Sequence, residues 1–155
     1  MNKKLMATIL IVSMAALVGV QVNITTATPP SGFNATVIAS GDLPKPVQAI
    51  MTGFGSGLEV SKIVVMLVRF EPGGSSGWHQ HGGPAWVVIN SGNLTFYNES
   101  CKPQVYQAPS THFESGKIHK AVNEDSEPTE VYATFMLPKD GELQTDVPDP
   151  GTCSS

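Results

Sequence analysis

Short runs of β-branched and aromatic residues, separated by glycine and proline, set the hydrophobic pattern of this chain. About eight such runs are expected to form strands, with a loose Pro- and Gly-containing segment between the first two. They lie at residues 33–39, 60–70, 86–90, 94–97, 105–106, 112–113, 118–122 and 130–137. Periodicity alone would allow a helix at 60–70, but its valines and flanking turns favour a strand. Closely spaced short strands without an amphipathic helix predict an all-β sandwich or barrel.

The N-terminal pattern differs from the rest. A short basic lead precedes an uncharged, mostly apolar run at residues 5–20, and small residues follow as far as Ala27. This order is typical of a secretory signal peptide, and the run of about 16 residues is short against the roughly 20 that a membrane span needs. We therefore expect a signal peptide at 1–27, a single domain with a Pro-rich tail at 28–155, and a secreted or extracytoplasmic protein. The alternative is an uncleaved leader that anchors the protein to a membrane.

The charge of the chain limits its partners. It has 9 basic and 13 acidic residues and a formal net charge of −4. Arg69 is its single arginine, and no basic patch is visible. Nucleic-acid-binding domains show clustered lysine and arginine, so we do not expect nucleic acid as a partner.

The two cysteines, Cys101 and Cys153, lack the CxxC-type spacing of a metal-binding pair. In an exported protein such a pair predicts a disulfide. Closing a loop of about 50 residues would stabilise the fold by roughly 4 kcal/mol on the chain-entropy model. It would also fasten the Pro-rich tail to the domain. Two free thiols are the alternative.

Three of the four histidines are candidates for one site. His79 and His81 alternate along a segment, and alternate side chains of a strand point to the same face. His119 follows a second glycine-containing turn, and a neighbouring strand could bring it to the same point. Imidazole is a ligand for zinc, copper, iron and nickel. The pattern therefore predicts a metal site.

The same residues resemble the first motif of the cupin superfamily, G(X)5HXH(X)3–4E(X)6G. Gly73, His79, His81 and Gly92 match it, and Ala85 stands at the glutamate position. The resemblance implies a small antiparallel β-barrel of jelly-roll topology with a metal ion inside.

The second cupin motif, G(X)5PXG(X)2H(X)3N, is matched in part. Gly116, His119 and Asn123 agree with it, whereas Ala108 replaces the first glycine and Glu114 the proline. We expect Asn123 to fasten the backbone near this motif rather than to contact a substrate.

Ala85 leaves the expected site without its usual carboxylate. Three neutral imidazoles would hold one divalent transition-metal ion (Fe, Cu, Zn, Mn or Ni) without neutralising its positive charge. They also leave coordination positions of the ion open, as in catalytic sites. Two alternatives stand beside this prediction. Ala85 marks a cupin that has lost its metal, or His112 or Glu114 faces inward and supplies a fourth ligand.

Two function classes follow from such a site. The first is a metal-dependent oxygenase or isomerase that acts on a small molecule. The second is a non-catalytic protein that binds a metal ion or a small ligand at the cell surface. The sequence shows no nucleophilic triad and no pair of carboxylates inside the barrel, which favours metal-centred chemistry or binding over proton transfer. A homodimer is left open.

Overall fold

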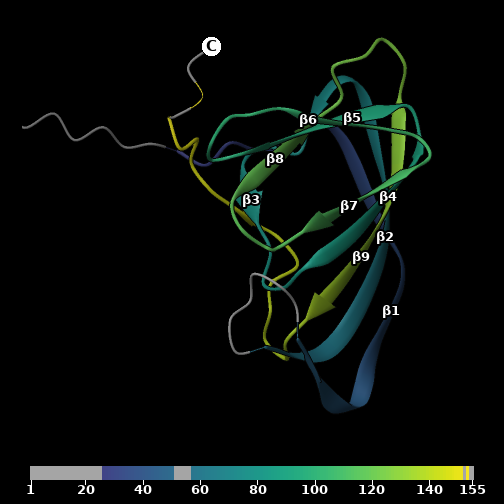
Figure 1. Cartoon of the computed structure of the whole chain (residues 1–155), viewed down its shortest axis with the longest axis vertical. Coiled ribbons are helices and arrows are strands. Elements are labelled where there is room, and N and C mark those ends of the chain that lie inside the picture. Colours follow the sequence, from purple (N-terminus) through teal and green to yellow (C-terminus); the bar gives the residue numbers. More distant parts are fainter. Residues whose placement is uncertain (1–25, 51–56, 152, 154–155) are drawn as a thin grey trace, which may run out of the picture.

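The computed structural model describes residues 26–50, 57–151 and 153, so the predicted signal peptide lies almost wholly outside the described residues. These residues form strands, turns and loops (Figure 1). The strands are β1 (Ser31–Ala49), β2 (Leu58–Ser75), β3 (His79–Gln80), β4 (Ala85–Ser91), β5 (Asn93–Asn98), β6 (Gln104–Gln107), β7 (Ser110–Glu114), β8 (His119–Val122), β9 (Thr129–Leu137) and β10 (Thr145–Asp146). Within the described ranges no helix has the length and apolar character to span a membrane.

The strands form one antiparallel sheet that curls into a nearly closed barrel. Its main path runs β10-β3-β8-β2-β9-β4-β7, with β1 on β2, and β5 joining β8 to β6. Figure 1 shows β1, β2, β9 and β4 running together on the right of the view, with β3 and β8 on the left and β5 and β6 at the top. The predicted all-β class and barrel architecture are therefore confirmed.

The core fills the inside of this barrel. β9 alternates inward and outward side chains, and it buries Val131, Ala133, Phe135 and Leu137. The same period of two in β2 and β4 turns further apolar side chains toward them. The hydrophobic runs were thus predicted correctly as strands.

The first strand is longer than its sequence pattern predicts. A loose segment was expected after residue 39, yet β1 continues to Ala49. The pairing with β2 shifts register between Asp42 and Val47, around Pro44 and Pro46. β1 pairs with β2 alone, so these prolines need not donate to a second neighbour, and edge strands tolerate such residues.

The C-terminal tail packs back against the barrel. β10 pairs with β3, and Ala27 and Pro148 form an isolated bridge beside it. Cys101 and Cys153 form a disulfide with their Cα atoms 5.1 Å apart. The tail therefore lies next to the strand that carries the HxH pair.

Candidate metal centre

The HxH strand is held between close turns. A side chain on Gly77 would collide with the carbonyl oxygen of Thr28, and one on Gly83 with that of Met136. Gly77 also has a φ of 67°, in the left-handed region that favours glycine. These glycines let the backbone of β3 approach its neighbours closely, which fixes where the imidazoles point.

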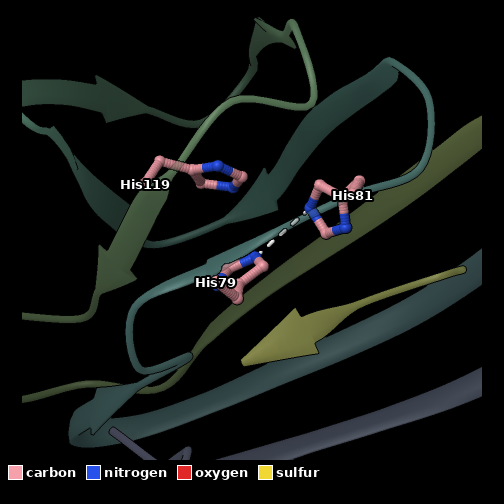
Figure 2. Close-up of side chains that lie close together, drawn as sticks. All are labelled: His79, His81 and His119. Carbon is pink, nitrogen blue, oxygen red and sulfur yellow. Dashed lines mark hydrogen bonds between the residues drawn. The ribbon is translucent and has the colours of Figure 1, made fainter. Parts of the chain in front are cut away.

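The structure brings together the three histidines singled out in the sequence. His79 on β3 lies directly opposite His119 on β8, and His81 follows β3 by one residue. The Nε2 atoms of His79 and His81 are 3.2 Å apart. One ring nitrogen from each histidine lies within 4.8 Å of the others, and Figure 2 shows the three rings facing one another. This cluster could hold a metal ion.

The second nitrogen of each ring fixes its orientation. Every Nδ1 faces a backbone carbonyl oxygen: Gly77 for His79 at 3.0 Å, Lys117 for His119 at 2.7 Å, and Leu143 for His81 at 2.6 Å. A carbonyl oxygen only accepts, so each Nδ1 carries the hydrogen and donates it. In the neutral rings Nε2 is then left with a free lone pair, the arrangement found in metal-ligating histidines.

A carboxylate completes the cluster. Glu114, at the end of β7, is only 8% exposed. Its Oε2 lies 3.2 Å from Nε2 of His81, and its Oε1 lies 3.2 Å from Nε2 of His119. Both are close contacts between a carboxylate and an imidazole, and the buried Nε2 of His119 has no hydrogen-bond partner among the described residues.

Sequence reasoning left the direction of Glu114 open together with that of His112. Both residues turn inward, because they alternate on β7, but only Glu114 reaches the cluster. The ring of His112 instead packs between those of Phe96 and Tyr106, with centroids 4.1 and 4.6 Å away. The pairing of β7 with β4 places Glu114 directly opposite Ala85, a relation that local sequence pattern does not show.

Burial and the charges of neighbouring groups shift the pKa values of this cluster in different directions. Burial, with the nearby His119 and His81, lowers the pKa of His79 to about 3. Burial alone would raise the pKa of Glu114, but the two imidazoles beside it outweigh this and hold the pKa well below its usual range. Burial likewise opposes a charge on His119, yet the carboxylate of Glu114 raises its pKa. The carboxylate of Glu114 is therefore favoured in its charged form among the three rings.

The donor set fits a cation. The three Nε2 lone pairs and the two carboxylate oxygens are all acceptors that face one another, and the Nε2 of His119 is buried without a hydrogen-bond partner. Acceptors arranged in this way need a proton or a metal ion between them. Imidazole and carboxylate together suit iron, manganese, zinc and related divalent ions.

Two hollows meet at the cluster. The first, here called the apolar chamber, is bordered by His79, His81 and Glu114, and most of its wall is aliphatic or aromatic. The second, the polar recess, is bordered by Glu114, His119 and Lys117. The candidate metal centre therefore separates an apolar space inside the barrel from a polar one.

Comparison with known proteins agrees with this architecture. A family model described as a Cupin domain matches residues 66–135. The polyketide cyclase RemF from Streptomyces resistomycificus superposes with a TM-score of 0.55 at 12% identity, covering 92% of this chain and 90% of its own. A cupin superfamily protein from Desulfitobacterium hafniense DCB-2 gives a TM-score of 0.49 at 10% identity, covering 68% and 78%. No curated protein sequence matches significantly.

Proposed function

We propose, from the premise that this chain belongs to the cupin superfamily, that it binds one divalent transition-metal ion through His79, His81 and His119. One observation carries the proposal. All three Nδ1 atoms face carbonyl acceptors, so three Nε2 lone pairs converge on one buried point. Fixing ligand orientation before the ion arrives raises the affinity of a site.

The apolar chamber suggests what the ion acts on. Its wall includes Phe33, Phe70, Val87 and Phe135, and His79 and His81 border the same space. Such a wall favours a small molecule that presents apolar or aromatic surface, with polar groups turned toward the ion. A bound ion could polarise a carbonyl group, lower the pKa of water or, as iron or copper, bind dioxygen. We therefore propose a metal-dependent oxygenase or isomerase of a small, largely apolar substrate.

One observation favours the second class, a non-catalytic binding protein. The ionisable residues along the apolar chamber are His79, His81 and Glu114, which all belong to the metal cluster. The described wall thus offers no separate acid or base for proton transfer. A ligand could be held there by the ion and the apolar wall without turnover.

Elemental analysis of purified protein tests the site. The wild type should carry about one transition-metal ion per chain, and His79→Ala and His119→Ala should each lose most of it. His112→Gln is the matched control, because this fourth histidine lies inside the barrel but outside the cluster. Unchanged metal content in both alanine variants would rule out the site.

Turnover separates the two function classes. The metal-loaded protein is screened for oxygen uptake and for isomerisation of small aromatic and carbonyl compounds. Turnover that is lost in His79→Ala supports the enzyme. Tight binding of a compound that leaves it chemically unchanged supports the binding protein.

We also propose export with cleavage after Ala27. The disulfide between Cys101 and Cys153 is consistent with an oxidising compartment. Thr28, the first residue after the proposed cut, accepts a hydrogen bond from the backbone N–H of Trp78 at 2.7 Å, so the mature chain would begin where the domain does. N-terminal sequencing of protein from the medium or envelope should begin at Thr28, and a chain that retains residue 1 would contradict cleavage.

A further inference from the structure

We infer that Glu114 is a fourth metal ligand, which delivers from β7 the carboxylate that Ala85 cannot deliver from β4. This inference rests on the proposed three-histidine site and adds to it a ligand at the position where the second motif has proline.

The pairing of two strands makes the exchange feasible. β4 and β7 are antiparallel neighbours, and Ala85 and Glu114 are direct partners in their ladder. Directly opposite residues project on the same face with Cβ atoms about 5 Å apart. Ala85 is fully buried, and its side chain is a single methyl group, which leaves room for the longer side chain of Glu114 to cross in front of it. A carboxylate from either strand can therefore reach the same region.

The contacts of Glu114 suit a ligand. Its two oxygens approach Nε2 of His81 and Nε2 of His119, each at 3.2 Å. Both rings donate through Nδ1 to carbonyl oxygens, so in their neutral form their Nε2 lone pairs face the carboxylate. A cation bound between these acceptors would be attracted to all of them and would remove their mutual repulsion. Metal–ligand bonds are about 2.0–2.2 Å, so small shifts of these side chains around an ion would satisfy all of them.

The extra ligand changes which chemistry the ion can support. Three imidazoles and one carboxylate leave a divalent ion with one net positive charge, and two positions stay open in a six-coordinate ion. Carboxylate oxygen is a ligand that manganese also accepts, whereas imidazole suits iron, copper, nickel and zinc. The site should therefore hold iron or manganese better than a site of three histidines alone.

Cobalt(II) binding tests the inference, since its visible absorption reports the ligand set and a competing chelator gives its Kd. Glu114→Ala and the near-isosteric Glu114→Gln should each raise the Kd at least about 10- to 100-fold, the size seen when even indirect partners of a metal are removed. Their absorption spectra should also change. In the double variant Ala85→Glu/Glu114→Ala, the carboxylate returns from β4, and the Kd and spectrum should move back toward those of the wild type. His112→Gln should leave both unchanged.

Different results would overturn the two proposals. The three-histidine site fails if the wild type binds no cobalt, or if His79→Ala binds it equally well. The role of Glu114 fails if the histidines are needed but both Glu114 variants keep the wild-type Kd and spectrum. The exchange between strands fails if the double variant folds, by circular dichroism, yet binds as weakly as Glu114→Ala.

Discussion

Asn123 should be among the most sensitive positions for stability. Its side chain is fully buried. The amide Nδ2 donates to the carbonyl oxygens of Phe70, Glu71 and Glu127 at 3.3, 3.2 and 2.8 Å, and Oδ1 accepts from the N–H of Asp125 at 3.1 Å. It thus joins the end of β2 to the turn between β8 and β9, as expected from the sequence.

Asn123→Ala should lower the free energy of unfolding by roughly 3–5 kcal/mol. Each buried group left without its partner costs about 1–3 kcal/mol, and the two amide hydrogens and the one oxygen serve four backbone groups. For a chain of this size the loss corresponds to a fall in Tm of about 10–15 °C. Urea denaturation followed by circular dichroism measures the loss directly.

The control is Asn90→Ala. Nδ2 of Asn90 also donates a hydrogen bond, to Glu130 at 3.0 Å, but that bond is exposed to solvent. Its loss should cost less than about 1 kcal/mol. Equal losses of unfolding free energy in the two variants, or a loss below about 1 kcal/mol in Asn123→Ala, would refute the reasoning. Buried hydrogen bonds would then not be the cause of the larger effect.

Three more outcomes are expected. In metal-free protein, the pKa of His79 is about 3 in the folded state and 6.5 in the unfolded state. Between these two pH values the unfolded state binds one proton more, so lowering the pH from 6.5 toward 3 should lower the urea midpoint of unfolding. A midpoint that stays constant over this pH range would contradict the expectation. Replacing Cys101 and Cys153 by serine removes a link across 52 positions and should lower the free energy of unfolding by about 4 kcal/mol. A reduced wild type as stable as the oxidised wild type would contradict this. Gly83→Ala should destabilise strongly, because the added methyl meets a backbone carbonyl, whereas Gly41→Ala has free space; thermal unfolding compares them, and equal Tm values would refute the clash.

The sequence was sufficient where local pattern decides structure. Alternation in β9 and the spacing of His79 and His81 each follow from the period of two in a strand, which needs no knowledge of the partner strand. The barrel was therefore predictable from these runs together with the glycine- and proline-rich turns.

Pairing between distant segments was out of reach of local pattern. The place of Glu114 depends on the register of β7 against β4, and a shift of one residue would turn it outward. β3 and β10 have two residues each, too few to leave a periodic signal. β1 continues past two prolines because it lies on an edge, a property of the assembled sheet.

The hydrogen bond from His81 to Leu143 spans 62 positions of the chain. During synthesis all three histidines therefore leave the ribosome before the carbonyl group that orients one of them. The barrel strands can pair while Nδ1 of His81 still faces water, and its orientation is fixed only when the tail docks beside β3. On the proposed metal site, loading would then be a late step of maturation, and a chain shortened before Leu143 should form its barrel but retain an added ion poorly.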